Sequence, residues 1–190
     1  MKVNHYTLLS LVFLALSLLM KSIPLLDIKV LKFFNTLMID KTFFSYFTEI
    51  GNGLICLAIT VPLLSLISYR TPLNNVKVQT LVFVGLGVGL IVKVLKELTS
   101  LYAVRPGFYE FEDVIYLEPV YLYSSFPSGH AATIFSLFLV WISLAFRNTK
   151  ISNAGLTITL LLIFALMVSL SRVIVAAHWL SDVLGSIALA

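Results

Sequence analysis

Long apolar runs separated by short polar segments dominate the chain. A helix that crosses a membrane needs about 20 mostly apolar residues. Five runs come near this length, at residues 6–23, 53–69, 78–101, 131–146 and 154–171, and a sixth covers residues 178–190. The pattern predicts an all-α fold, a polytopic membrane helix bundle of about six spans, in a single domain over residues 1–190.

The segment between the first two runs has a different pattern. Between residues 25 and 52, aromatic and aliphatic residues recur near helical spacing, with lysines and aspartates between them. This pattern predicts one or two amphipathic helices that lie at the membrane interface after span one.

The two ends of the chain also bear on its membrane topology. Lys2 precedes the first run, but residues 18–21 form no small-residue cleavage site, so we expect an uncleaved signal-anchor. After His178 only 12 residues remain, about 18 Å of helix against a hydrocarbon core of about 30 Å. We therefore expect either that the natural chain continues past Ala190 or that span six stops inside the bilayer.

Composition supports an integral membrane protein. Hydrophobic residues make up 59% of the 190 and charged residues only 12%, with a mean hydropathy of +1.02, whereas about a quarter of the residues in a soluble domain are charged. The one cysteine, Cys56, lies in an apolar run, which excludes a disulfide framework and a metal–thiolate site. The net charge of +4 bears on topology rather than on nucleic acid. We expect membrane lipids as partners and no nucleic acid, and the sequence carries no signal for an oligomeric state.

Basic residues predict which side of the membrane each loop faces. In a six-span arrangement the N-terminal side holds five basic residues and no acid, and the opposite side holds eight basic residues and all nine acids. Four of those eight are candidates for a functional site, and without them the counts are five and four, which favours a cytoplasmic N-terminus. The five are Lys2, Arg70, Lys77, Arg147 and Lys150. In a bacterium this places the protein in the inner membrane, with its site facing the periplasm or the cell exterior.

Ionisable and polar residues from distant segments reach one membrane face in this arrangement. Such residues in or beside membrane spans are costly and usually functional. They are Lys93, Lys96 and Arg105 at the end of span three, Ser128, Gly129 and His130 at the start of span four, Arg172 at the end of span five, and His178 and Asp182 at the start of span six.

These residue types suit the transfer of a phosphoryl group. Arg105 and Arg172 can each bind two oxygens of a phosphate. Ser128 can cap the helix of span four, whose first free N–H groups can bind an anion, and Gly129 allows that anion to approach closely. His130 lies beside them and can give a proton to a leaving oxygen.

His178 and Asp182 form a second functional pair. At a spacing of four residues we expect them on one helix face. The carboxylate would then fix the tautomer of the imidazole and leave its other nitrogen free to attack phosphorus. With two arginines and an anion-binding helix start, this pair indicates a phosphoryl-transfer site.

Two stretches resemble the signature motifs of a known family. PSGH at residues 127–130 and SRVIVAAHWLSD at residues 171–182 are similar to the second and third motifs of the type 2 phosphatidic acid phosphatases, the PAP2 superfamily. The resemblance implies a membrane lipid phosphatase that needs no metal and no cofactor and acts on a lipid phosphate or pyrophosphate. It implies that His178 attacks phosphorus to form a phosphohistidine, that Asp182 orients His178, and that His130 protonates the leaving group.

The first motif of that family, K-x6-R-P, is imperfect in this chain. The phosphate-holding residues that the resemblance implies are Arg105, Ser128, the Gly129 backbone, Arg172 and a lysine. However, the position seven residues before Arg105 is Leu98, and the nearest lysines are Lys96 and Lys93. On an unbroken helix neither lysine would share a face with Arg105, but Pro106 disfavours helix at Arg105. A short non-helical stretch would turn Arg105 back over Lys96, so we predict Lys96 as the phosphate-binding lysine.

Other functions are compatible with parts of this pattern. A lipid phosphotransferase would share the site and use a lipid hydroxyl in place of water, and a catalytically silent relative would bind lipid without turnover. A transporter would have charged or broken positions at mid-membrane, whereas the charges here lie at span ends. The substrate stays open among undecaprenyl pyrophosphate, lipid A, phosphatidylglycerophosphate and phosphatidate. The acidic loop is either solvated or binds a divalent ion or a sugar headgroup; its acids are Glu110, Glu112, Asp113 and Glu118.

Overall fold

The structure, a computed structural model, describes residues 5–68, 74–117, 119–146 and 154–190. Within these ranges the regular elements are eight α-helices and one short 3-10 helix, with no strand. The α-helices are α1 (His5–Ser22), α2 (Pro24–Asn35), α3 (Lys41–Glu49), α4 (Gly53–Ser68), α5 (Asn74–Thr99), α6 (Gly129–Phe146), α7 (Ala154–Ile174) and α8 (Leu180–Leu189). The all-α prediction is confirmed.

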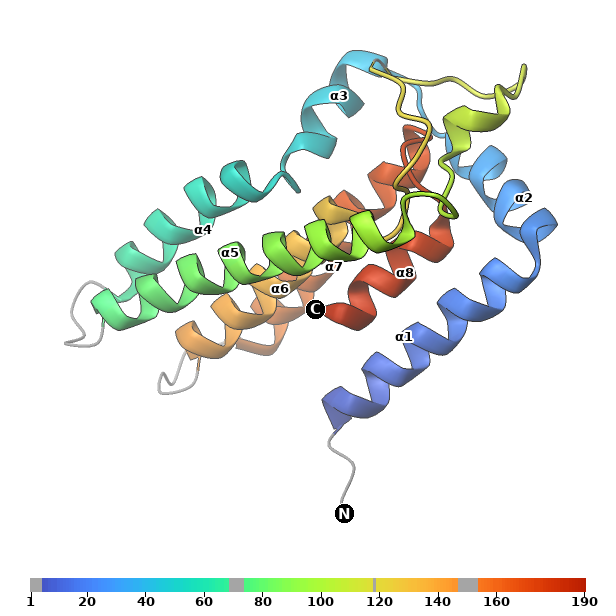
Figure 1. Cartoon of the computed structure of the whole chain (residues 1–190). Coiled ribbons are helices and arrows are strands. Elements are labelled where there is room, and N and C mark those ends of the chain that lie inside the picture. The colour runs from blue at the N-terminus through green and yellow to red at the C-terminus, as the bar shows by residue number, and fades with distance from the viewer. Residues whose placement is uncertain (1–4, 69–73, 118, 147–153) are drawn as a thin grey trace.

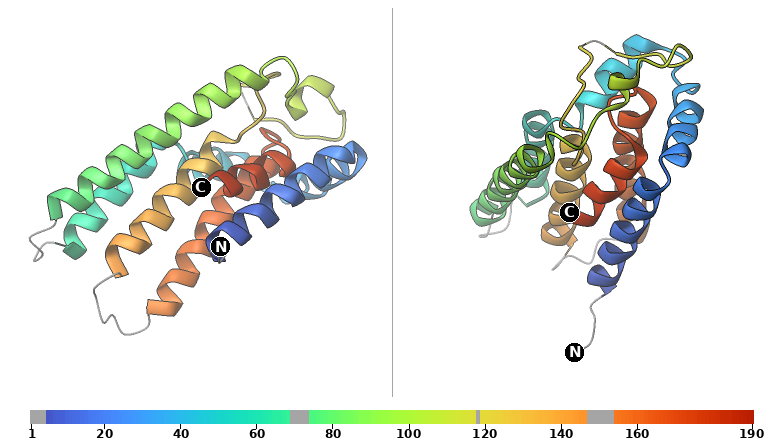
Figure 2. Two further views of the ribbon diagram at one scale, coloured as in Figure 1. Left: turned by 60° about the horizontal axis from the view of Figure 1, so that its bottom comes forward. Right: turned by 45° about the vertical axis from the view of Figure 1, so that its right-hand side comes forward.

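Six apolar helices form a bundle around α6. Helix α6 packs against α4, α5, α7 and α8, and α1 lies along α8 (Figures 1 and 2). Helices α5 and α7 are each long and apolar enough to cross a membrane, and α1 with α2 and α3 with α4 also qualify if each bent pair counts as one span. With the shorter apolar helices α6 and α8, the arrangement agrees with the predicted bundle of about six spans. Of the basic residues used to predict topology, Lys2, Arg70, Arg147 and Lys150 lie outside the described residues.

Two short helices stand where the sequence predicts interfacial helices, at one end of the bundle (Figure 1). Pro24 occupies the first turn of α2, where its missing N–H costs nothing, and α2 bends away from α1 by 101°. Asp40 caps α3 by accepting hydrogen bonds from the N–H groups of Thr42 and Phe43, at 2.7 and 3.2 Å. Helix α3 then meets α4 at a bend of 65°.

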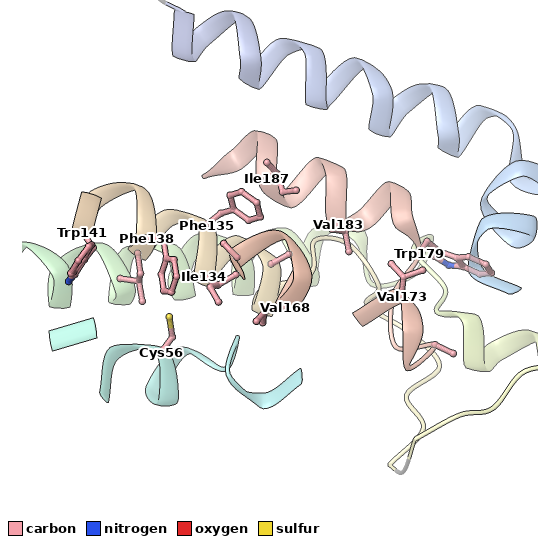
Figure 3. Packing of buried hydrophobic residues seen from close by; sticks show 14 of the residues in the cluster. Cys56, Ile134, Phe135, Phe138, Trp141, Val168, Val173, Trp179, Val183 and Ile187 are labelled. Carbon is pink, nitrogen blue, oxygen red and sulfur yellow. The ribbon is translucent and has the colours of Figure 1, made fainter. Parts of the chain in front are cut away.

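The core lies where α6 is enclosed by its neighbours. Figure 3 shows Phe135 and Phe138 of α6 close to Ile187 of α8 and Cys56 of α4. Many large apolar side chains on the outer faces of α1, α4 and α5 are instead exposed. Exposure of this extent is unfavourable in water and is expected where lipid tails are the solvent.

Candidate active site

The predicted site residues lie at the end of the bundle that carries α2 and α3. Helix α5 ends there at Thr99, α6 begins at Gly129, and the α7–α8 connection lies beside them (Figures 1 and 2). The segment between α5 and α6 folds over the same end. Four helix ends and one long loop thus surround the polar groups.

A cavity of about 320 Å³ opens among these segments. Arg105, His130 and Arg172 line it, together with Thr48 and Glu49 of α3. Five loop residues also line it: Tyr116, Leu117, Pro119, Val120 and Tyr121. Three of the predicted site residues therefore line the same cavity, although Arg105 and Arg172 are 67 positions apart in the chain.

Arg105 fixes the loop and keeps part of its guanidinium free. Its backbone is extended, with φ −87° and ψ 163°, so α5 does not continue to it, as the proline argument predicted. The guanidinium donates to the carbonyl oxygens of Tyr123, Ala177 and Ser124, at 2.9, 3.2 and 3.4 Å. A guanidinium has five N–H donors, so two are left for a ligand.

Arg172 is positioned by the interfacial helix α3. Its Nη1 donates to Oγ1 of Thr48 at 2.7 Å, and Oγ of the preceding Ser171 lies 3.1 Å from the same oxygen. Arg172 lies in the last turn of α7, so the contact ties the end of that helix to α3. Arg172 also lines the cavity.

His130 faces a carboxylate across the cavity. Its Nε2 lies 3.6 Å from Oε1 of Glu49, beyond ordinary hydrogen-bond distance. A histidine that faces a cavity beside a carboxylate can give or take a proton there.

His178 and Asp182 are adjacent, but not for the reason that the sequence suggested. Helix α8 begins at Leu180, so His178 precedes it, and the prediction that the pair shares a helix face is wrong. Instead, the α7–α8 connection folds back over the first turn of α8, where Asp182 accepts a hydrogen bond from the N–H of Trp179 at 3.2 Å. This places Nδ1 of His178 at 3.8 Å from Oδ2 of Asp182.

Burial determines the charge state of His178. The residue is only 2% exposed, and this burial lowers the pKa of His178 to about 3. The imidazole is therefore neutral at physiological pH and keeps the lone pair that a nucleophile requires.

Ser128 and Gly129 lie at the start of α6 and away from the cavity lining. The N–H of Ser128 donates to Oγ of Ser186 at 2.8 Å, and that hydroxyl donates to the carbonyl of Asp182 at 2.6 Å. The Ser128 hydroxyl accepts from the N–H of Ala131 at 3.5 Å, a long capping contact. The PSGH segment is thus joined to α8 rather than open to the cavity at these two residues.

Of the two candidate lysines, Lys96 lies nearer to the cluster of cations. Lys96 is half-buried, and the charges of Arg105, Arg172 and Asp182 act on it. Lys93, one turn earlier on α5, is exposed. Lys96 is thus the more buried of the two lysines, although it does not line the cavity.

Several buried nitrogens in this cluster have no protein partner. Among the described residues, Nε2 of His130, Nε of Arg172 and Nδ1 of His178 form no hydrogen bond. Buried polar atoms are otherwise almost always paired, because an unpaired one costs about 1–3 kcal/mol. Two of the three, on His130 and Arg172, belong to residues that line the cavity, as is expected where an anionic ligand binds.

One carboxylate of the acidic loop forms an ion pair with a neighbouring helix. Nζ of Lys32 from α2 lies 2.6 Å from Oδ1 of Asp113, and the ammonium lowers the pKa of that exposed carboxyl. No group of three potential ligands that could hold a metal ion is found within the described ranges, and Glu118 lies outside them.

Comparison with known proteins identifies the family. The family model of the PAP2 superfamily matches residues 77–190, which is more than half of the chain. The chain belongs to the PAP2 superfamily.

Solved structures of PAP2 proteins share the fold. A transmembrane PAP2-type phosphatidylglycerolphosphate phosphatase from Bacillus subtilis superposes with a TM-score of 0.74 at 21% identity, covering 98% of this chain and 90% of that one. LpxE from Aquifex aeolicus superposes with a TM-score of 0.62 at 22% identity, covering 86% of this chain and 90% of that one. No curated protein matches the sequence. The chain is thus a membrane protein of the PAP2 superfamily with the PAP2 fold.

Some residues of this PAP2 site were not found from the sequence. Thr48 and Glu49 are ordinary polar residues of an amphipathic helix, and their role appears only when α3 packs against the end of α7. Ser125, which donates to Oδ2 of Asp182 at 2.5 Å, stands two residues before the PSGH motif. Ser125 could have been predicted from its place in the polar segment that contains this motif. Nothing in the sequence around Thr48 and Glu49 indicated that they belong to the site.

The two candidate lysines can be tested against each other. Lys96→Ala is expected to lower kcat/KM for a lipid phosphate by about 100-fold, as the loss of one preorganised donor to a reacting oxyanion does. Lys93→Ala is the matched control on the same helix and should stay within about threefold of the parent. The measurement is steady-state phosphate release by purified, folded variants. A large loss in Lys93→Ala with an active Lys96→Ala would contradict the assignment, and two active variants would leave the arginines as the phosphate holders.

Proposed function

We propose that the protein is an integral membrane lipid phosphatase that removes phosphate from a lipid phosphate or pyrophosphate through a phosphohistidine on His178. The observation that carries the proposal is the convergence of Arg105, Arg172 and His130 on one cavity beside the His178–Asp182 pair. The PAP2 fold and the phosphatase activity named for its solved relative support it.

Binding of the phosphate rests on the cations around the cavity. Arg105 and Arg172 line the cavity, Nε of Arg172 has no protein partner, and Lys96 adds a third positive charge that acts with both arginines. Arginine forks suit the planar arrangement of two phosphate oxygens. Ser128 and the Gly129 backbone, which the sequence suggested for the same task, do not line the cavity, so the scheme rests on the cations.

The first chemical step transfers the phosphoryl group to the enzyme. The lone pair on Nε2 of His178 forms a bond to phosphorus as the bond from phosphorus to the leaving oxygen breaks. His130, protonated before the step, gives its proton to that oxygen, and Oε1 of Glu49 lies 3.6 Å from its Nε2. Asp182 stabilises the positive charge that develops on the His178 ring.

The second step returns the enzyme to its starting state. His130, now neutral, takes a proton from a water molecule as the water oxygen attacks phosphorus. The bond between Nε2 and phosphorus breaks, and His178 regains its lone pair. Inorganic phosphate leaves, and every role is filled by a side chain of this chain.

The place of the cavity supports a lipid substrate. The cavity lies where α6 begins and α7 ends, beside helices whose outer faces are apolar. A substrate with its tail in the bilayer would present its phosphate at this level. The relative from Bacillus subtilis is named for phosphatidylglycerolphosphate, which makes a glycerophospholipid phosphate the first substrate to test.

Phosphate release from defined lipids tests the proposal. Purified protein in nanodiscs is supplied with phosphatidylglycerophosphate, phosphatidate, a lipid A phosphate or undecaprenyl pyrophosphate. We expect inorganic phosphate from at least one of them, at a rate that EDTA leaves unchanged. Transfer to a lipid hydroxyl without phosphate release would indicate a phosphotransferase, binding without turnover would contradict an enzyme, and loss on chelation with recovery on one metal would contradict the mechanism.

We also propose that the site faces the outer side of the cell membrane, because the basic residues favour a cytoplasmic N-terminus. A reporter joined after Lys150 should then behave as cytoplasmic, and a reporter inserted near Glu112 should behave as exported. The reverse pattern would refute this orientation and would leave the chemistry unaffected.

A further inference from the structure

A lysine at the end of α1 contacts the carboxylate that supports the nucleophile. Nζ of Lys21 lies 3.2 Å from Oδ1 of Asp182. The same ammonium lies over the ring of Phe126, 4.3 Å from its centroid, and Phe126 directly precedes the PSGH segment. Lys21 therefore bridges the second and third motif segments, although α1 lies outside the residues that the family model matches.

The buried carboxylate of Asp182 needs a positively charged partner. The residue is 0% exposed, and a buried carboxylate without compensation is strongly unfavourable. Its Oδ2 is occupied by Ser125 and by the N–H of Trp179, and it is the oxygen nearest to His178. Lys21 provides the contact to the other oxygen.

Packing holds Lys21 in this place. Oγ of Ser17, one turn earlier on α1, donates to the carbonyl of Ser181 at 2.7 Å. A side-chain carbon added to Gly185 of α8 would lie 2.5 Å from the Phe126 ring and 2.9 Å from Oγ of Ser17. The three segments are thus in close contact, and α1 has little freedom to slide along α8.

The other charged residues near Asp182 differ from Lys21 in position or in sign. Lys96 and Arg105 act on it from the side where phosphate would bind, and a bound phosphate would offset their charge. Asp27 of α2 acts with the opposite sign. Lys21 does not line the phosphate cavity; with Asp182 it lines a separate space of about 370 Å³ between α1, α2 and the loop after α5. Its charge would therefore persist when substrate is bound.

We propose that Lys21 is a positioning residue that keeps Asp182 ionised and oriented toward His178 during the transfer of the phosphoryl group. The inference rests on the proposed phosphatase function and adds a role for α1. Lys21 does not touch the substrate, so its loss lowers the rate of the chemical step and leaves phosphate binding by Arg105 and Arg172 in place.

Replacing the charged side chain of Lys21 distinguishes the positioning role from a purely structural one. Lys21→Met is expected to lower kcat about 10- to 100-fold, the loss typical of a partner that orients a catalytic group, with KM within about twofold of the parent. Lys21→Arg keeps the charge and should recover most of kcat. Lys29→Met on α2, an exposed lysine, is the matched control and should equal the parent.

The experiment measures phosphate release from the best substrate, with thermal unfolding and size-exclusion profiles for each variant. If Lys21→Met does not fold, Lys21→Gln removes the charge and keeps a polar group. An uncharged, folded variant with kcat within threefold of the parent would overturn the inference, as would a raised KM with unchanged kcat or a Lys21→Arg variant as slow as Lys21→Met. A parent that releases no phosphate from any lipid would overturn the proposed function and this inference with it.

Discussion

The burial of one carboxylate, that of Asp182, constrains the whole site. A charge without contact to solvent must be surrounded by partners, and its partners come from three parts of the chain: Lys21 of α1, Ser125 of the loop, and the backbone of Trp179. Each contact fixes a segment that also carries another functional group. The loop leads into PSGH, and the connection before α8 carries His178. The contacts that satisfy Asp182 therefore hold α1, the loop before PSGH and the α7–α8 connection together at one end of the bundle.

The position of this end explains how a largely apolar protein can hold several cations. Cations in the middle of the bilayer would be costly, whereas Arg105 and Arg172 lie where helices stop and where backbone carbonyls and Thr48 can accept their N–H groups. Those contacts use only part of each guanidinium. The donors that remain unpaired keep the cavity suited to an anion before any substrate arrives, so little rearrangement is required when phosphate binds.

The features that could be predicted from the sequence were those encoded locally. Apolar runs predicted the helices, and Pro106 correctly predicted that Arg105 does not continue α5. The spacing of His178 and Asp182 predicted their proximity, but the proposed helix face was wrong, because Asp182 caps a helix that begins after His178. The contacts of Thr48, Glu49 and Lys21 could not be predicted, since each joins residues more than 80 apart in the chain and no pattern within one helix signals its partner on another.

The central claim is that His178 carries the phosphoryl group between the two chemical steps. Brief incubation with a ³²P-labelled lipid phosphate, followed by denaturation and peptide mapping, tests it most directly. The account predicts a label on the peptide that contains His178, stable to alkali and labile to acid as a phosphohistidine is, and absent from a folded His178→Ala variant. A label on another residue, or rapid turnover of His178→Ala, would contradict it.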